Sequence, residues 1–233
     1  MVRPLRAPGY DDRVLLPLLA ALLAAAAAER VADTVDPAAL RDADVVLHTS
    51  RTRQAGAVAW ATASVYTHVG LIARDGAGVV VIEAVQPVKR TPWAAWQRRG
   101  LGGRVSVLRH PNLDDTQRRA IVRAAEALLG RPYDLHFAPG DDRLYCSELV
   151  VRAYAAAGVQ LAPATPAGAL GLAGAPVQAL LRARWRRHPS CAGARSLAAC
   201  MPALARLEIV TPIGLRRDPA LRLVASSYPP ALR

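Results

Sequence analysis

The apolar residues of this chain fall into short runs and spaced stripes that predict both strands and helices. Runs rich in valine, isoleucine and leucine predict strands, here at residues 44–48, 67–73, 79–85, 104–109 and 207–213. Apolar residues at helical spacing, each stripe followed by glycine, predict helices at residues 114–129 and 146–157. Shorter helices are expected at residues 54–63, with Trp60 on the apolar side, and after Thr91-Pro92, where Trp93 and Trp96 lie.

The order of these elements, a helix and several strands followed by two helices, is typical of an α+β domain with an antiparallel sheet packed against helices. Residues 29–162 are predicted to form its core. From residue 163 to 203 the composition shifts to alanine, proline and arginine, which we interpret as a partly irregular insertion or cap. Residues 204–233 are expected to supply a closing strand and then a surface tail over the last twenty residues.

A hairpin between two of these strands brings a histidine and an acid together. Asp75-Gly76 between apolar runs is a strong hairpin signal. If these two residues form the loop, counting outward pairs His68 with Glu83. Directly opposed residues share a face, with Cβ atoms about 4.5–5.5 Å apart. Taken alone, His68 is equally interpreted as a buried histidine with its hydrogen bonds satisfied, and Glu83 as a carboxylate at the solvent-exposed edge of a strand. When the two lie opposite each other, however, the carboxylate can fix the orientation of the imidazole and stabilise its charged form.

The N-terminal segment resembles an export signal. Arg3, Arg6 and Arg13 precede an apolar run at residues 14–28 that is too short for a comfortable membrane span. Its length and the alanines that end it fit a signal peptide with a cleavage site. Residues 1–28 are therefore predicted to be a signal peptide or, alternatively, an N-terminal anchor, and an exported, periplasmic or cell-envelope location is expected.

The charge of the chain is strongly positive, with a formal net charge of +12, and Lys89 is its only lysine. Such a balance suits an anionic partner, or it reflects a compositional bias towards arginine, alanine, proline and glycine. No nucleic-acid motif is present, so no nucleic-acid partner is expected. The basic run at residues 182–188 is either a solvated surface or a contact for anionic lipid. His110, His136 and His188 lack the spacing of metal ligands, and no metal or cofactor is expected.

The three cysteines divide into a close pair and a single residue. In an exported protein Cys191 and Cys200 can close a small disulfide, which is worth about 2–3 kcal/mol. That would leave Cys146 as the free thiol, at the predicted start of a helix, where unpaired amides and the helix dipole favour the thiolate. The alternative is a buried, inert cysteine.

Four strings together make the sequence resemble one family. They are Ser-Val-Tyr-Thr-His-Val-Gly-Leu-Ile at residues 64–72, Val-Ile-Glu-Ala at 81–84, Arg-Pro-Tyr-Asp at 131–134 and Tyr-Cys-Ser-Glu-Leu-Val at 145–150. The chain resembles the YiiX/YebB-like permuted branch of the NlpC-type papain-like cysteine hydrolases, with lecithin:retinol acyltransferase a more distant relative. The resemblance covers residues 44–159, about half of the chain. It implies a circularly permuted papain-like fold.

Carried over position by position, the resemblance implies that Cys146 is the nucleophile, His68 the base and Glu83 the third polar residue. His48 stands where such proteins often have glutamine. The implied function is a thiol-dependent hydrolase or acyltransferase that works through a covalent acyl-enzyme. The expected substrate is a cell-wall peptide amide or a lipid-linked acyl group, with possible peripheral association with the membrane or cell wall. The alternative is an inactive module of the same fold that binds a lipid or wall fragment.

Overall fold

The computed structural model describes residues 32–76, 78–161 and 163–233, so the segment predicted to be a signal peptide or anchor lies outside the described residues. A six-stranded sheet organises this part of the chain, and every neighbouring pair of its strands is antiparallel. Its order is β4-β3-β2-β1-β5-β8. The strands are β1 (Val45–His48), β2 (His68–Asp75), β3 (Gly78–Glu83), β4 (Lys89–Pro92), β5 (Ser106–Arg109) and β8 (Arg222–Ser226). The predicted α+β class with an antiparallel sheet is confirmed.

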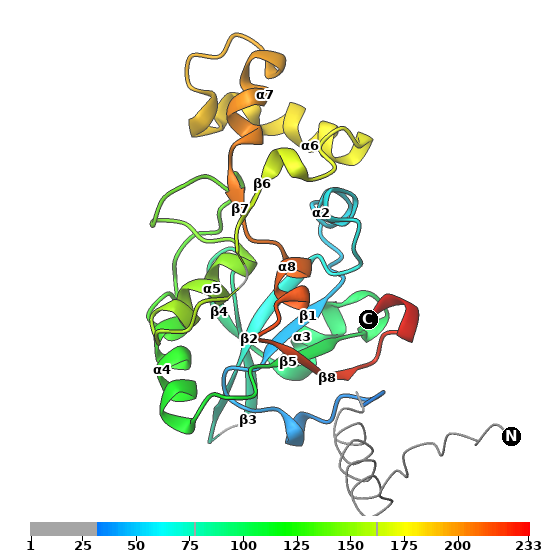
Figure 1. Cartoon of the computed structure of the whole chain (residues 1–233), viewed down its shortest axis with the longest axis vertical. Helices are drawn as coiled ribbons and strands as arrows, with labels where there is room; N and C mark the ends of the chain where they lie inside the picture. The colour runs from blue at the N-terminus through cyan, green and yellow to red at the C-terminus, as the bar shows by residue number, and fades with distance from the viewer. Residues whose placement is uncertain (1–31, 77, 162) are drawn as a thin grey trace, which may run out of the picture. The chain divides into compact units, whose positions relative to one another are not determined.

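Helices cover both faces of the sheet (Figure 1). Side chains alternate between faces along each strand, so Leu47 and Leu71 pack towards α4 (Asp115–Glu126) and α5 (Cys146–Ala155). Val46 and Ile72 point the other way, against Trp96 of α3 (Trp93–Arg99). Complete burial of an aliphatic side chain contributes about 1.5–3 kcal/mol, so these two layers fix the sheet between the helices.

The two long helices, α4 and α5, begin within one residue of their predicted starts. Asp114 caps α4 by accepting a hydrogen bond from the Gln117 backbone at 2.7 Å, and the Gln117 side chain bonds back to Asp114. The second helix, α5, begins at Cys146. Beyond its end Gly158 takes a positive φ of 78° that favours glycine.

The predicted register of the hairpin is wrong by two residues. Asp75 pairs with Gly78 and Leu71 with Ile82, and the same register places Glu83 opposite Gly70 rather than His68. A shift of two residues keeps every side chain on its face, so His68 and Glu83 still share one. A Cβ atom on Gly70 would lie 2.3 Å from Val81 Cγ1, which shows that neighbouring side chains use the space beside this glycine.

Two predictions for the C-terminal region are wrong. The last twenty residues are not a surface tail, because β8 completes the sheet and the buried Tyr228 hydroxyl accepts a hydrogen bond from the Thr49 backbone at 2.8 Å. Of the strand predicted at 207–213, only two residues form a strand, β7 (Glu208–Ile209). It pairs with β6 (Thr165–Pro166). Thr211 then caps α8 (Pro212–Arg217) and ends the extended stretch.

Between β6 and β7 the chain forms a cap, which we define as residues 167–207, carried beyond the paired strands (Figure 1). The cap holds α6 (Ala175–Arg184) and α7 (Leu197–Ala205), has a small apolar core, and is closed by a disulfide between Cys191 and Cys200. The helix α2 (Ala55–Thr62) packs against α6. Trp60, expected on the apolar side of α2, is instead 59% exposed.

Short 3₁₀ turns complete the described structure, at Pro37–Ala39, Leu101–Gly103, Ala167–Ala169, Trp185–Arg187, Pro189–Cys191 and Pro230–Leu232. Within the described ranges, none of the helices combines the length and apolar character needed to cross a membrane.

Candidate active site

Cys146 lies at the first position of α5 and is 5% exposed. The backbone N–H groups of Val69 and Ser147 interact with its sulfur and help to lower the pKa of the thiol. The Ser147 hydroxyl donates to the carbonyl of Val210 at 2.7 Å, which ties the start of the helix to the segment after β7. The sulfur is therefore held at a fixed point between a strand and a helix N-terminus.

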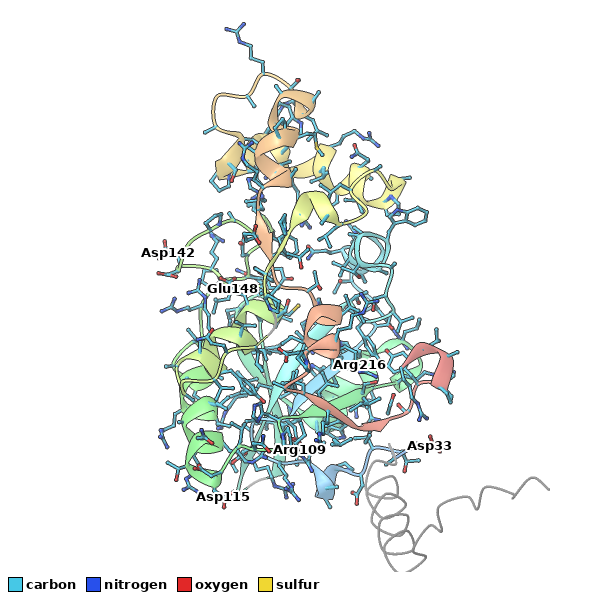
Figure 2. The ribbon with its side chains drawn as sticks, viewed as in Figure 1. Asp33, Arg109, Asp115, Asp142, Glu148 and Arg216 are labelled. Atoms are coloured by element: carbon cyan, nitrogen blue, oxygen red, sulfur yellow. A yellow bond between two sulfur atoms is a disulfide. The ribbon has the colours of Figure 1, made fainter. Side chains whose placement is uncertain are left out.

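The loop before this helix is fastened to it by charge. Glu148 lies at the start of α5 and Asp142 on the loop that leads into it (Figure 2). Arg152 bonds Glu148 at 2.6 Å, Asp141 at 2.7 Å and the carbonyl of Gly140 at 2.6 Å. These contacts join one turn of the helix to the preceding loop and limit the movement of the cysteine.

His68 is the first residue of β2, at the end of the sheet, and its ring contacts both other candidate residues. Its Nε2 atom lies 2.7 Å from Oε2 of Glu83. Its side chain also interacts with the thiol of Cys146, and this interaction raises the pKa of His68 and lowers that of Cys146. Because Nε2 is occupied by the carboxylate, Nδ1 is the ring atom that serves the sulfur. The structure thus brings together the three residues singled out from the sequence.

Glu83 is fully buried and has two further partners that the sequence did not reveal. The hydroxyl of Thr91 donates to Oε1 at 2.6 Å, and the guanidinium of Arg99 donates to both carboxylate oxygens. Thr91 belongs to β4, a strand that the sequence analysis missed, and Arg99 ends α3. The sequence indicated only that Glu83 needs hydrogen-bond donors, because a carboxylate in an apolar strand is buried and a buried charge without partners is costly. It did not indicate which residues supply them.

These contacts set the charges of the site. Burial lowers the pKa of His68, but hydrogen bonds and charge interactions with Cys146 and Glu83 outweigh burial and raise it to about 9. Burial raises the pKa of Cys146, but the partnership with His68 and two backbone N–H donors lowers it overall. Burial also opposes ionisation of Glu83, yet His68, Arg99 and Thr91 bring its pKa to about 2. Near neutral pH the site therefore holds an imidazolium and a carboxylate, and the lowered pKa of Cys146 favours its thiolate.

A second imidazole lies beside this site without joining it. His48 is the cross-strand partner of His68, and its ring stacks on Trp96 with centroids 4.1 Å apart. Burial, and then the positive charges of His68 and Arg99, lower its pKa to about 2 against the opposing effect of Glu83. His48 is therefore neutral, and its Nδ1 atom has no hydrogen-bond partner among the described residues.

Two hollows adjoin the site. The first, which we call the acyl cavity, has a volume of about 130 Å³, carries Cys146 on its wall and is lined mainly by aliphatic residues of α2 and the cap. The second, which we call the arginine cleft, has a volume of about 690 Å³ and carries His68 on its wall. Gln54, Thr67 and Tyr133 line both hollows, so the hollows meet beside the thiol and the imidazole.

Comparison with known proteins decides the family. Residues 39–225 match the model of a family described as a permuted papain-like amidase enzyme, YaeF/YiiX, C92 family. The chain belongs to this family. The membership confirms the predicted permuted papain-like fold and the coarse class of cysteine hydrolase.

Two relatives in this family are similar over most of their length. The uncharacterized protein YiiX of Escherichia coli strain K12 is 34% identical over 147 residues, which are 62% of this chain and 73% of that protein. The crystal structure of yiiX from Escherichia coli O157:H7 superposes with a TM-score of 0.70 at 32% identity, covering 81% of this chain and 98% of that one. That relative is described as a metalloprotein. Here, residues 32–76, 78–161 and 163–233 contain no cluster of three or more histidine, cysteine or acidic side chains fit to hold a metal ion.

Proposed function

We propose that this chain is a cysteine amidase in which Cys146 is the nucleophile, His68 the general acid and base, and Glu83 the residue that orients His68. The observation that carries the proposal is the 2.7 Å contact of the imidazole with the buried carboxylate, beside a helix-start cysteine whose pKa the same imidazole lowers. A thiolate held by an imidazolium at a helix N-terminus is the arrangement that nucleophilic cysteine chemistry requires.

The reaction follows from the charges of the three residues. The thiolate of Cys146 attacks the carbonyl carbon and forms a C–S bond, while Nδ1 of His68 gives its proton to the departing nitrogen as the C–N bond breaks. The product is a thioester on Cys146 and a free amine. Water then attacks the thioester and gives a proton to His68, the C–S bond breaks, and the thiolate and imidazolium are restored as the acid leaves.

Donors for the oxyanion come from two elements. The first N–H groups of a helix lack intrahelical partners, so those at the start of α5 can receive the developing charge. Burial, and then the negative charge at Cys146, raise the pKa of Tyr133 well above its usual value, which keeps its hydroxyl protonated. Its oxygen accepts from Gln54 Nε2 at 3.3 Å, so the hydroxyl proton of Tyr133 is available as a second donor.

The location and substrate class belong to the same proposal. An exported protein of the cell envelope would encounter wall-peptide amides and lipid-linked acyl groups, and the disulfide of the cap suits an oxidising compartment. The released acyl group passes to water, or to another nucleophile in an acyltransferase variant of the same chemistry.

Labelling with an electrophilic thiol probe tests the nucleophile. Under non-reducing conditions Cys146 is the free cysteine, because Cys191 and Cys200 are paired. The parent protein should be labelled at near-neutral pH, Cys146→Ala should not be labelled, and His68→Asn should react more than tenfold more slowly. Equal labelling of the parent and Cys146→Ala would remove Cys146 from the proposal.

The acyl group can be identified by trapping it. Intact-mass analysis of the parent protein after exposure to a crude lipid or wall extract should show an adduct on Cys146 that Cys146→Ala lacks. If Cys146→Ala retains a ligand while the parent protein forms no adduct and turns nothing over, the chain is a binding module of the same fold and the amidase proposal fails.

A further inference from the structure

The two hollows beside the site differ in chemistry, and each carries a different reacting group. Cys146 lines the acyl cavity and His68 lines the arginine cleft. In the proposed reaction the sulfur receives the acyl carbon and the imidazolium protonates the leaving nitrogen. The wall on which each group lies therefore assigns the acyl half of a substrate to the cavity and the amine half to the cleft.

The acyl cavity suits an apolar group. Aliphatic side chains of the cap line it, among them Val177, Leu181 and Leu204. An apolar cavity of about 150 Å³ holds a benzene-sized molecule, and the volume of about 130 Å³ here is similar. A branched or short linear acyl chain of about six carbons is the group that this space accommodates.

The arginine cleft suits an anion. Of its five lining arginines, Arg51, Arg53 and Arg98 have no ion-pair partner within the part of the chain that the structure describes. Arg184 bonds only uncharged oxygens, Gln54 Oε1 at 2.8 Å and the carbonyl of Leu135 at 2.9 Å. Four guanidinium groups thus face the cleft without a carboxylate partner. Such groups attract carboxylates and phosphates by charge-assisted hydrogen bonds.

No acid on the cleft wall offsets these arginines. Among the described residues that line it there is no aspartate or glutamate, and the nearest carboxylate in the site, Glu83, is already bound by Arg99 and His68. The neutral His48 also lines the cleft with its unpartnered Nδ1 atom. A volume of about 690 Å³ lies within the range of small-molecule sites.

We infer, on the basis of the proposed amidase function, that the substrate is an amide with an apolar acyl group and an amine half that bears an oxyanion. The acyl group occupies the acyl cavity, and the oxyanion lies against Arg51, Arg53, Arg98 and Arg184 in the arginine cleft. The negative charge is on the leaving amine, not on the acyl group, because Arg51, Arg53 and Arg98 line the cleft on the imidazole side and not the acyl cavity, whereas Arg184 lines both hollows.

A set of matched amides tests this inference by binding to full-length Cys146→Ala, which cannot turn them over. The hexanoyl amides of 4-aminobenzoate and of 4-aminophenyl phosphate carry an oxyanion, and the methyl ester of the first is uncharged. By calorimetry both anions should bind at least tenfold more tightly than the ester at low salt, with the difference shrinking at 0.5 M salt. Preference for the carboxylate would indicate an amino acid or peptide as the amine half, and preference for the phosphate a phosphate-bearing amine.

Variants assign the effect to the cleft. In the Cys146→Ala background, Arg51→Gln, Arg53→Gln and Arg98→Gln combined should remove the advantage of the anions. Arg123→Gln on α4 is the matched control and should retain it, and circular dichroism checks that each variant is folded. Replacing hexanoyl by acetyl should weaken binding more than tenfold through loss of the apolar contact.

The outcomes separate the two proposals. Equal affinity for the ester and the anions, or an equal loss in the Arg123→Gln control, overturns the assignment of the cleft, and equal binding of acetyl and hexanoyl amides overturns that of the cavity. Absence of Cys146-dependent hydrolysis of all these amides by the parent protein overturns the proposed amidase function instead.

Discussion

The guanidinium of Arg99 bonds both carboxylate oxygens of Glu83, the acid that contacts His68 with one of the same oxygens. Arg99 therefore reaches the imidazole only through the carboxylate and is a positioning residue. Its side chain is 42% exposed on the cleft side, whereas that of Glu83 is fully buried. The partly exposed guanidinium of Arg99 thus balances the charge of the buried Glu83 carboxylate and keeps it ionised.

Replacing Arg99 by glutamine should lower kcat about tenfold, because the acid that orients His68 loses its own orientation. It should also raise the pKa of Glu83 from about 2 towards its ordinary value. A carboxyl group with a depressed pKa stabilises the fold above its unfolded pKa and loses that contribution as pH falls through the folded one. Acid unfolding followed by circular dichroism should therefore begin at higher pH in Arg99→Gln. Arg99→Lys should restore part of both properties, and an unchanged acid transition would contradict this role.

The raised pKa of His68 predicts the alkaline limit of activity. In the proposed reaction the imidazolium acts as an acid, so kcat/KM should decline above about pH 9. The same group stabilises the fold fully below pH 6.5 and loses that contribution as pH rises through about 9. Iodoacetamide should alkylate Cys146 at a lower pH than it alkylates an ordinary thiol, since the thiol pKa is lowered. An alkylation rate that rises only above pH 8.5 would show that the thiolate–imidazolium pair does not form.

Gly70 leaves the space on which the contact between His68 and Glu83 depends. In Gly70→Ala the new Cβ would lie 2.3 Å from Val81 Cγ1 and 3.5 Å from Glu83 Cβ. This overpacking should cost about 1–3 kcal/mol in the free energy of unfolding and lower kcat by displacing Glu83. Gly56→Ala is the matched control, because its Cβ would meet no atom within 4 Å and alanine favours the helix. Urea unfolding and kinetics of the two variants test the difference, and equal behaviour would contradict it.

The disulfide of the cap should affect substrate binding rather than chemistry. Replacing Cys191 and Cys200 by serine should destabilise the cap by about 2–3 kcal/mol, because the bond closes a short loop. Since the cap lines the acyl cavity, KM for a hexanoyl amide should rise several-fold while the rate of labelling of Cys146 stays within about twofold. Labelling that falls in parallel with affinity would show that the cap also organises the thiol.

The strands and helices that carry the site were predictable because their patterns are local. Apolar runs identified β2 and β3, and the period of two along a strand kept His68 and Glu83 on one face even though the register was wrong by two residues. The start of α5 at Cys146 also followed from the sequence. These features depend on residues that are neighbours along the chain.

The partners of Glu83 were not predictable because they come from elements without such a pattern. The edge strand β4 reads Lys-Arg-Thr-Pro, which has no apolar alternation, so neither it nor the contact of Thr91 was expected. In the cap, Pro202 lies inside α7, where proline normally argues against a helix. The strand β8 depends on pairing with β5, more than a hundred residues away in the chain, and no local signal encodes that pairing.

The pairing of Thr165 with Ile209 places the two ends of the cap side by side. A segment whose ends meet in this way can be replaced without moving the rest of the domain apart, and such sites tolerate insertion of whole segments. The sheet and α5 can therefore be inherited unchanged while the inserted segment diverges freely. On this architecture, a different segment on the same two-stranded stem would change the part of the cavity wall that the cap supplies.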